Sequence, residues 1–470
     1  MIFSMSIIME AYDTSLVPSF FALPAFQKRY GHYYPNIHQY QVSAPWQAGI
    51  NNAATVGVVF GGFMNGWASN RWGYKKVMLV SLFLINAFIF MPFFAPSLPI
   101  LIVGEFLCGL PWGVFATTGP AYASEVCPLA LRGYLTVYVN LCWATGQFIA
   151  GGVTKAYVNN TTKWSYKVPF AVQWIWPLPL FLIILFAPES PWWLVKQNRL
   201  DEAEKTIRSL ASSSTEEIHG RISQMRHTIL LEEEINNGHS YLDCFKGVNL
   251  RRTEICCVAF AGQMFSGAQF AYGPAYFFEQ AGMSPDKSFA VGVGGTGLLW
   301  VGTVLSWVML TYFGRRTIYV GGITTMFCIL LIIGIISAST HGSTGGMWAQ
   351  ASLCLLWQLV YSLTLGPITY CIISETSAVR VRAKTVVLSR NVYNIVAIIS
   401  QQLEPYMMNP ASWNWIGKTA FFWSGSALFT MVWSYFRLPE CKVSLSSLER
   451  RLSGDRSDLH ISPFAVEVFG

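Results

Sequence analysis

The stretch ASEVCPLALRG at residues 123–133 decides the fold, because a related stretch, SETSAVRVRA, follows at 374–383. In both copies an arginine lies seven positions after the glutamate. The paired residues are Glu125 with Arg132 and Glu375 with Arg382. Since the two glutamates are 250 positions apart in a chain of 470 residues, a tandem duplication covering about half of the chain is predicted.

Two further charged motifs also have a second copy at nearly the same spacing. RWGYKK at 71–76 is matched by FGRR at 313–316, and Pro188-Glu189 is matched by Pro439-Glu440. Each motif follows a long apolar run, so the duplicated unit is predicted to lie in a membrane. Duplicated membrane halves are typical of secondary transporters, which predicts transport and not catalysis.

Long apolar runs account for most of the chain. The sequence is 53% hydrophobic and 12% charged, whereas an ordinary soluble domain has about 25% charged residues. A membrane-spanning helix needs about 20 mostly apolar residues. Twelve such runs lie at approximately 1–27, 46–68, 77–96, 99–124, 133–154, 168–187, 255–278, 288–313, 318–340, 347–374, 385–403 and 419–436. We therefore expect an all-α membrane protein with twelve transmembrane helices in two pseudo-symmetric six-helix bundles.

The distribution of Lys and Arg predicts the orientation. With both termini in the cytoplasm, the inner loops, linker and tail hold 23 Lys and Arg and the outer loops hold 7. This excess has the direction of the positive-inside rule and predicts a multi-pass protein, which we expect in the plasma membrane. An outer loop carries two overlapping glycosylation acceptors, Asn159 and Asn160. The net charge of +7 comes from the inner loops and tail, so no nucleic-acid partner is expected.

Charge density divides the chain into four predicted parts: bundles at 1–187 and 255–437, a linker at 188–254 and a tail at 438–470. The linker holds 20 of the 55 charged residues, and its apolar residues recur at helical intervals, which predicts cytoplasmic helices. No constellation suggests an enzyme or a cofactor. The ten cysteines lack paired-ligand spacing, so no metal site is expected.

The beginning of the chain lies almost inside the first apolar run. No charged region and no small-residue cleavage site precede this run, which argues against a cleaved signal peptide. A missing cytoplasmic segment before residue 1 is left open as an alternative.

Ionisable residues inside the apolar runs are candidate functional residues. Glu10 and Asp13 lie on one face of the first helix. Burying a carboxylate in a membrane costs about 2.5–3.5 kcal/mol on insertion scales, so these acids should face a cavity or a partner. Arg390 in the eleventh run is the cation expected to pair with them, and the three are candidate proton-coupling residues. Glu105 is either a cavity residue or a charge at a helix end.

The repeated charges at the inner helix ends predict a cytoplasmic gate. Alternating access rocks one half against the other, so breakable ion pairs on one side would hold the inner side closed. The candidate gate residues are Arg71, Glu125, Arg132, Arg315, Glu375 and Arg382. Positive-inside anchoring would explain the arginines but not the repeated glutamates.

Buried amides predict a polyhydroxylated substrate. An unsatisfied amide in a membrane is costly, and sugars offer hydroxyl groups to amides and C–H faces to aromatic rings. Amides within the apolar runs are Asn140, Gln147, Gln263, Gln269, Gln358, Asn391 and Asn394. They suit a sugar better than a lipid or a hydrophobic drug.

Several longer strings resemble the sugar porters of the major facilitator superfamily. PESPWWL at 188–194 and FGRR at 313–316 are similar to their loop motifs. Other strings are similar to fungal α-glucoside permeases of the maltose type. These are EAYDTSLVPSFFALPAFQKRYG (10–31), LCGLPWGVF (107–115), YASEVCPLALRGYL (122–135), NLCWATGQ (140–147) and YFFEQAGM (276–283). The resemblance extends from about residue 10 to residue 440.

This resemblance implies uptake of an α-glucoside such as maltose with a proton, by a protein expected to be a monomer. It implies coupling roles for Glu10, Asp13 and Arg390. It also gives sugar-binding positions at Asn140 and Gln263, and a position at Tyr370 where many hexose porters carry Trp. The full set of candidate sugar-binding residues is Asn140, Gln263, Tyr276, Tyr370 and Asn391.

The sequence departs from the family pattern at four places. Asn70 stands where the loop motif usually has Asp, and Val58 where a second-helix glutamate is common. Glu105 stands where hexose porters have Arg, and the tail LPECKVSLSSLERR differs from the usual one. These departures leave open a uniporter, a carrier of another glycoside or polyol, a non-transporting sugar sensor and a degraded paralogue.

Overall fold

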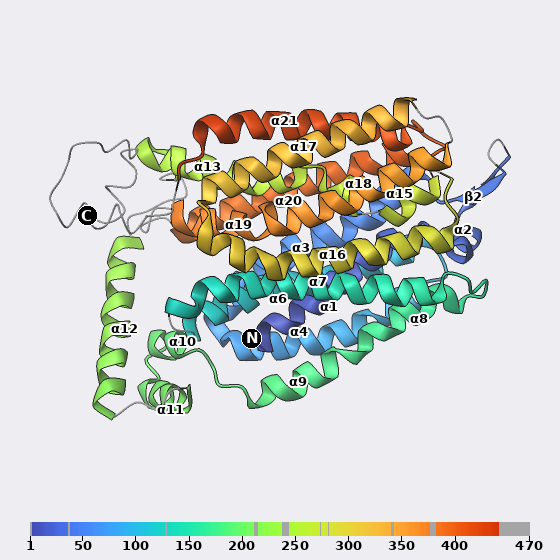
Figure 1. Cartoon of the computed structure of the whole chain (residues 1–470). Coiled ribbons are helices and arrows are strands. Elements are labelled where there is room, and N and C mark those ends of the chain that lie inside the picture. Colours follow the sequence, from blue (N-terminus) through green and yellow to red (C-terminus); the bar gives the residue numbers. More distant parts are fainter. Residues whose placement is uncertain are drawn as a thin grey trace, which may run out of the picture.

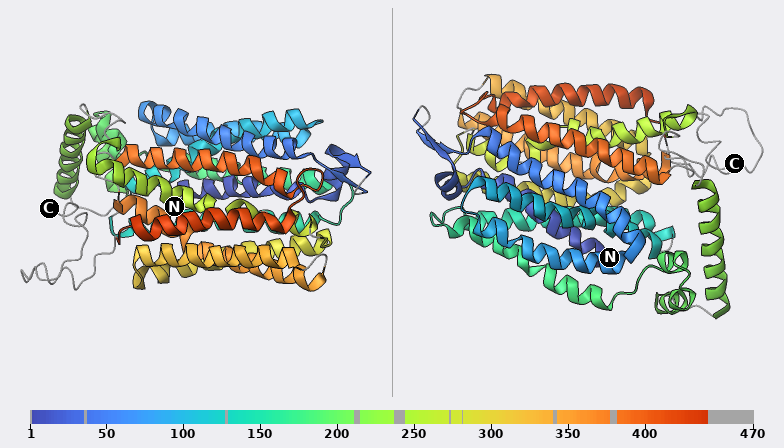
Figure 2. Two further views of the ribbon diagram at one scale, coloured as in Figure 1. Left: turned by 90° about the horizontal axis from the view of Figure 1, so that it is seen from above. Right: turned by 180° about the vertical axis from the view of Figure 1, so that it is seen from behind.

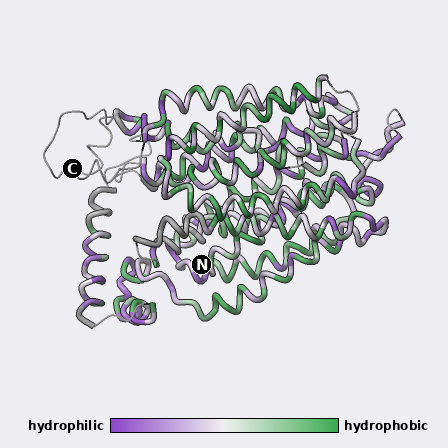
Figure 3. Tube along the Cα trace, viewed as in Figure 1, coloured by the Kyte–Doolittle hydropathy of each residue, from purple (hydrophilic) through white to green (hydrophobic). Residues whose placement is uncertain are grey.

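Twelve helical segments lie side by side along the long axis of the molecule, in the order of the twelve predicted apolar runs (Figure 1). The computed structural model describes residues 2–35, 38–126, 129–210, 215–236, 244–272, 274–280, 282–339, 343–376 and 382–440. Figure 3 shows apolar residues along the middle of these segments and polar residues gathered toward the two ends of the molecule.

The first half contributes six of these segments. They are α1 (Ile2–Phe20), α3 (Ala44–Trp72), α4 (Tyr74–Phe88) with α5 (Phe90–Phe94), α6 (Leu98–Val126), α7 (Leu129–Tyr157), and α8 (Trp164–Val172) joined through η1 (Gln173–Ile175) to α9 (Pro177–Phe186). Between α1 and α3 lie the short helix α2 (Pro24–Tyr30) and an antiparallel pair of strands, β1 (His32–Tyr34) and β2 (Gln39–Gln41), with Tyr33 opposite Tyr40.

The second half contributes the other six segments. They are α13 (Gly247–Phe265) with α14 (Ala268–Tyr272) and α15 (Pro274–Gln280), α16 (Pro285–Tyr312), α17 (Arg315–Ser339), α18 (Thr344–Leu363) with α19 (Leu365–Thr376), α20 (Arg382–Met408), and α21 (Thr419–Arg437) after η4 (Ile416–Lys418). Within the described residues, six spans satisfy strict length and hydropathy limits. These are Tyr74–Phe94, Leu98–Gly119, Trp164–Phe186, Pro285–Tyr312, Arg315–Ser339 and Thr344–Ile373.

Equivalent helices pack in the same way in both halves. In the first half α3 packs on α6 and α1 on α7, and in the second half α16 packs on α18 and α13 on α20. The halves meet where α7 contacts α16 and where α3 contacts α20. The two groups of helices are seen from two further directions in Figure 2. The duplication predicted from the charged motifs therefore matches the packing of the helices.

Glycines allow α3 and α6 to approach closely. A Cβ atom added to Gly109 would lie 2.5 Å from the carbonyl oxygen of Ala54, and one added to Gly57 would lie 2.9 Å from the Cα atom of Gly109. Both helices carry glycines four positions apart, Gly57 with Gly61 and Gly109 with Gly113. Small residues at this spacing are typical of membrane helices whose backbones touch. Any larger side chain would separate two helices that border the cavity described below.

Two segments that border the interior are broken. Gly267 separates α13 from α14 with φ of +88°, a left-handed conformation that favours glycine. Thr364 separates α18 from α19. Discontinuous helices in transporters are typical of substrate sites, because the unwound backbone can be satisfied only beside protein or a water-filled cavity.

The linker helices lie at one end of the molecule, and β1, β2 and α2 lie at the other (Figure 1). The linker contains α10 (Pro191–Lys196), α11 (Leu200–Leu210) and α12 (Thr215–Asn236). Trp193 and Leu194 of α10 share a small apolar core with Ile207 and Ile218. Helix α13 begins at Gly247, so its first turns fall within the predicted linker range.

The two Pro-Glu motifs have the same structural role. The Glu189 carboxylate accepts hydrogen bonds from the backbone N–H groups of Tyr74 (3.1 Å) and Lys75 (3.2 Å) at the beginning of α4. Glu440 accepts one from the N–H group of Arg315 (2.8 Å) at the beginning of α17. Carboxylates are favourable there because the N-terminus of a helix is electropositive. Burial raises the pKa of Glu189, and these N–H groups oppose that shift.

Candidate functional site

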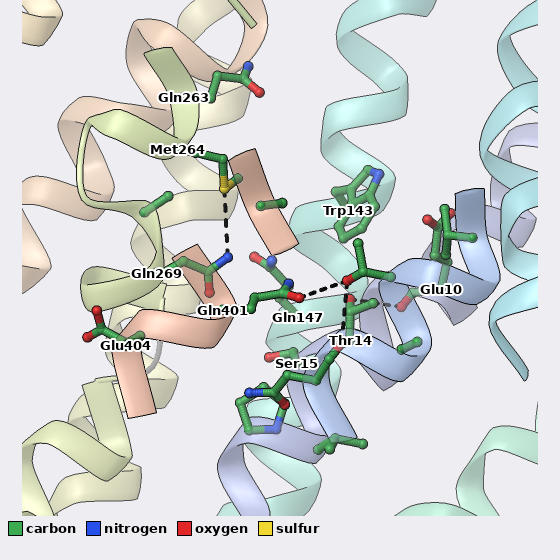
Figure 4. Close-up of a pocket in the computed structure, with 18 of the residues that line it drawn as sticks. Glu10, Thr14, Ser15, Trp143, Gln147, Gln263, Met264, Gln269, Gln401 and Glu404 are labelled. Atoms are coloured by element: carbon green, nitrogen blue, oxygen red, sulfur yellow. Dashed lines mark hydrogen bonds between the residues drawn. The ribbon is translucent and has the colours of Figure 1, made fainter. Parts of the chain in front are cut away.

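A polar cavity of about 320 Å³ lies between the two halves. Its wall is formed by α1, α3, α6 and α7 of the first half and by α13–α16 and α18–α20 of the second half. In Figure 4, labelled side chains of the first half, such as Glu10 and Gln147, face those of the second half, such as Gln269 and Gln401. This volume is near the lower end of the usual range of about 300–1,000 Å³ for small-molecule pockets.

Acidic side chains gather on the first-half wall of the cavity. Glu10, Asp13 and Glu105 all line it, and each is at most 2% exposed. Asp13 accepts a hydrogen bond from the Gln173 side-chain amide in η1. Asp13 and Glu105 are also hydrogen-bonded to each other through their side chains. Glu105 is therefore a cavity residue, which decides between the two readings of this position that the sequence left open.

Arg390 lies among aromatic rings on the second-half wall. Its guanidinium carbon is 4.7 Å from the ring centroid of Tyr393 and 5.8 Å from that of Phe260. The arginine is also hydrogen-bonded to the Tyr370 side chain. A guanidinium over an aromatic face is attracted by the negative face of the ring, and this attraction is stronger away from water.

The pairing expected between Arg390 and the two first-helix acids has a different geometry from the one predicted. The charge of Arg390 acts on Glu10, but in the described part of the chain no ion pair within 4 Å joins them. Asp13 instead has Gln173 and Glu105 as its polar neighbours. The prediction that Arg390 pairs with both acids is therefore wrong for Asp13, because Asp13 points toward α6 and η1.

Most of the predicted sugar-binding residues line the cavity. Asn140, Gln263, Tyr276 and Tyr370 are part of its wall, whereas Asn391 is not. The side-chain nitrogen of Asn140 is buried without a hydrogen-bond partner, so it is free to donate to a substrate hydroxyl.

The other predicted amides divide into two groups. Gln147, Gln269 and Asn394 line the cavity, and Gln269 donates to Met264 Sδ (3.7 Å), as drawn in Figure 4. Gln358 does not line it and instead donates to the carbonyl oxygen of Ala271 (2.6 Å), which holds α14.

Hydrogen bonds join the halves on the side where β1, β2 and α2 lie. Gln47 of α3 donates to the Tyr276 hydroxyl (3.2 Å), and Gln27 of α2 donates to the Glu279 carboxylate (3.2 Å). The Asn409 amide donates to the carbonyl oxygen of Val42 (2.9 Å). The sequence analysis missed Gln27, Gln47 and Glu279. Their only signal is that polar residues sit next to long apolar runs.

At the linker end, the repeated glutamates have different partners. Arg315 Nη2 lies 3.2 Å from Glu375 Oε1 and forms an ion pair between α17 and α19. Glu125 accepts from the Tyr74 hydroxyl (2.8 Å) and from the Ser190 hydroxyl. Burial raises the pKa of both carboxyl groups; Arg315 opposes that shift for Glu375, and the two hydroxyl donors oppose it for Glu125.

The remaining gate residues show less. The guanidinium of Arg71 lies 5.8 Å from the ring centroid of Trp67, on the same helix. The side chains of Arg132 and Arg382 lie outside the described residues. The network predicted around the first copy is therefore seen only at Glu125, with hydroxyl donors.

The two glycosylation acceptors follow α7. The Asn159 amide nitrogen donates to Asp286 at the beginning of α16 (3.2 Å). The Asn160 amide oxygen accepts from the backbone N–H (2.9 Å) and the hydroxyl (2.7 Å) of Thr162. Lys155 also forms an ion pair with Asp286, so this loop connects the halves. No group of three His, Cys, Asp or Glu side chains that could hold a metal ion occurs in the part of the chain that the structure describes.

The fold is that of the major facilitator superfamily. The proton:xylose symporter XylE, solved with 6-bromo-6-deoxy-D-glucose bound, superposes with a TM-score of 0.76 and 18% identity. The match covers 96% of this chain and 97% of XylE. An inward-open structure of XylE from E. coli gives a TM-score of 0.74 at 18% identity. The predicted all-α architecture of two helical bundles is confirmed.

The chain belongs to the family of sugar (and other) transporters, whose model matches residues 1–450. It is 40% identical over 445 residues to the maltose permease MAL31 of Saccharomyces cerevisiae, covering 93% of this chain and 72% of that protein. It is 39% identical over 449 residues to the alpha-glucosides permease MPH3 of the same yeast, covering 93% and 74%. The protein is therefore a multi-pass sugar transporter of a membrane and not an enzyme, as the sequence predicted.

Proposed function

We propose that this transporter moves an α-glucoside, such as maltose, into the cell together with a proton. The names of the relatives support the substrate class, because they are a maltose permease and permeases for α-glucosides. The observation that carries the proposal is the cavity between the halves, with carboxyl groups on one wall and a cation with amides and aromatic rings on the other. This combination suits a proton and a polyhydroxylated ligand in one site.

The sugar binds to the amide and aromatic groups of the cavity wall. Asn140 offers a donor without a partner, and the ring of Tyr370 offers a face for sugar C–H groups. Gln263 already donates to the carbonyl oxygens of Leu365 (3.4 Å) and Gly366 (3.3 Å), both long for a hydrogen bond. These contacts can be exchanged for a sugar hydroxyl because the net worth of a neutral hydrogen bond is about 0.5–1.5 kcal/mol.

Proton coupling uses the buried acids of α1 with Arg390. Glu10 has one carboxylate oxygen buried without a hydrogen-bond partner, and the charge of Arg390 acts on it. An ionised carboxylate in that position is costly, so it favours either a bound proton or a nearby cation. A sugar that moves Arg390 would change this balance and thereby link the two ligands.

Alternating access exposes the cavity first to one side and then to the other. On the side of β1 and β2, the contacts between Gln47 and Tyr276 and between Gln27 and Glu279 must break for the cavity to open there. On the linker side, the inner-end glutamates and arginines form the gate. The protein acts as a monomer in the plasma membrane, with both termini in the cytoplasm.

The test is uptake of radiolabelled maltose by yeast cells that lack their own α-glucoside transporters. We expect accumulation above the external concentration, loss of accumulation with a protonophore, and competition by unlabelled α-glucosides but not by xylose. The matched control is the same strain carrying Asn140→Leu, which removes the free amide donor at similar size. Uptake that reaches only equilibrium and ignores the protonophore would assign a uniporter. Sugar binding without any uptake would assign a sensor.

A further inference from the structure

Two buried carboxyl groups from different helices are in contact in the first-half wall. Asp13 on α1 and Glu105 on α6 are 2% and 1% exposed, and their side chains are hydrogen-bonded to each other. Both line the cavity, so a proton can reach them from its interior. Val58 on α3 borders the same cavity and is apolar, so α3 adds no carboxylate at that position.

A hydrogen bond between two carboxyl groups requires a proton on one of them. An ionised carboxylate can only accept, and two adjacent ionised carboxylates repel each other strongly away from water. Two carboxylates that share a site therefore keep one proton between them. In the state described by the structure, the pair holds one proton and one negative charge.

The neighbours of the pair indicate where the proton lies. The Gln173 amide donates to Asp13 Oδ1, which stabilises a negative charge on Asp13. Glu105 Oε1 is buried without a hydrogen-bond partner. Leaving a neutral carbonyl oxygen unpaired costs much less than leaving an ionised oxygen unpaired. Glu105 is therefore the protonated partner that donates, and Asp13 is the ionised partner that accepts.

The titratable groups that face the pair are few. Tyr12 lies next to Asp13 on α1, and Cys108 lies one turn from Glu105 on α6. The cation of the cavity, Arg390, acts on Glu10. From η1 the pair meets the uncharged Gln173. The single negative charge of the pair is thus held mainly by hydrogen bonds, which makes it ready to accept a second proton.

We propose that Glu105 and Asp13 together form the proton-binding group of the transport cycle, and that Glu105 is a coupling residue in its own right. The proton comes from cavity water and adds to a carboxylate oxygen of Asp13, so the charge of the pair changes from −1 to 0. It leaves to water when the cavity opens to the other side, and Glu105 keeps its own proton throughout. This inference rests on the proposed proton coupling and assigns its site.

The first experiment detects the protons directly and does not depend on transport. The full-length protein is placed in lipid nanodiscs, and infrared difference spectra follow the C=O stretching band of protonated carboxyl groups as the pH is changed. We expect a band that persists when the pair is singly protonated and disappears in Glu105→Gln. In Asp13→Asn the band should shift, because Glu105 loses its acceptor, and should no longer change with pH. An unchanged spectrum in Glu105→Gln would overturn the proposal.

The second experiment measures coupling in cells or vesicles. In Glu105→Gln we expect sugar-dependent proton uptake to fall on the order of tenfold, while exchange of labelled sugar across the membrane persists, as for loss of a group that acts in one step. The matched control is Glu105→Asp, which keeps a carboxyl group and should retain coupling. Because the two residues act as one unit, adding Asp13→Asn to Glu105→Gln should have little further effect.

The outcomes separate this inference from the proposed function. If the wild-type protein does not couple sugar and proton movement, the proposed function fails, and the infrared arm still decides whether the pair holds the protons. If wild-type coupling is present and Glu105→Gln retains it, the coupling site lies elsewhere and the carboxyl pair is only structural. If Glu105→Gln does not reach the membrane, the Asp13→Asn spectrum decides whether Glu105 carries a proton.

Discussion

The two halves of the transporter place a glutamate at the same inner position but bind it in different ways. In the second half Glu375 meets the guanidinium of Arg315, whereas in the first half Glu125 meets the hydroxyl groups of Tyr74 and Ser190. The equivalent helices pack alike in both halves. Duplication has therefore kept the position of the carboxylate, while the partner that neutralises it has diverged.

The cavity walls show the same divergence. The first half supplies Glu10, Asp13 and Glu105, and the second half supplies Arg390 and the aromatic ring of Tyr370. A symmetric frame thus carries an asymmetric site. We infer that the first half sets the proton stoichiometry and that the second half contributes most to sugar recognition.

The largest expected effect comes from the acids of the first half. Asp13→Asn should abolish accumulation against a gradient, because the carboxyl pair can no longer change its charge, while exchange of sugar across the membrane continues. Radiolabelled maltose accumulation and counterflow exchange in the same vesicles measure the two properties separately. Concentrative uptake that matches wild type would show that the first half does not hold the coupling site.

The next effect comes from the cation of the second half. Arg390→Ala removes contacts with Tyr393 and Phe260 that are worth about 0.5–2 kcal/mol each and leaves Glu10 without a nearby cation, so uptake should fall about 10-fold to 100-fold. Arg390→Lys keeps the charge but not the planar contact, and should restore part of the activity. Initial uptake rates over a range of sugar concentrations provide the measurement. Equal rates for both variants would remove the aromatic contact from the explanation.

A smaller effect is expected at the inner ends, where the two halves can be compared directly. Glu375→Gln breaks an ion pair whose side chains are 21% and 32% exposed, which should cost about 1 kcal/mol. If the gate closes the inner side, that cost reduces the affinity of an inhibitor that binds from outside by about fivefold. Glu125→Gln keeps an acceptor for Tyr74 and should change the affinity less than about twofold. Equal effects would reduce both glutamates to topological anchors.

The smallest effect is expected at the two capped helices. Glu189→Gln and Glu440→Gln each keep a hydrogen-bond acceptor but lose a charge at the beginning of a helix, which is worth about 0.3–1 kcal/mol. The midpoint of thermal unfolding in detergent should fall slightly and by a similar amount in both variants. A large drop in one variant alone would show that the caps, unlike the helix packing, are not equivalent.

The sequence predicted the fold well because its signals are coarse and repeated. Long apolar runs give the helices, and charged motifs at equal spacing give the halves. The choice of partner was not predictable in the same way. Gln173, which binds Asp13, lies in a 3₁₀ turn between α8 and α9, and nothing in its neighbourhood distinguishes it from an ordinary buried amide. Partner choice depends on the rotation of each helix, which apolar length does not encode.

Asn391 shows this limit on a single helix. Arg390, Asn394, Ala397 and Gln401 of α20 line the cavity at spacings of three or four residues, as one helix face does. Asn391 lies about 100° further around the helix from Arg390, since an α-helix has about 3.6 residues per turn. Once Arg390 is placed in the cavity, helical periodicity favours Asn394 over Asn391, and this comparison was available from the sequence.

The caps at α4 and α17 decide where the transporter could be divided into two co-expressed polypeptides. Glu189 and the indole of Trp193 both bind the first half, the latter through the carbonyl oxygen of Asn70 (3.0 Å). A first fragment that ends with α9 would therefore lack its own closing residues, whereas one that ends after α10 would carry them. The second fragment must in turn extend to Glu440. The duplicated unit thus ends beyond its sixth helix, at the carboxylate that returns to its third helix.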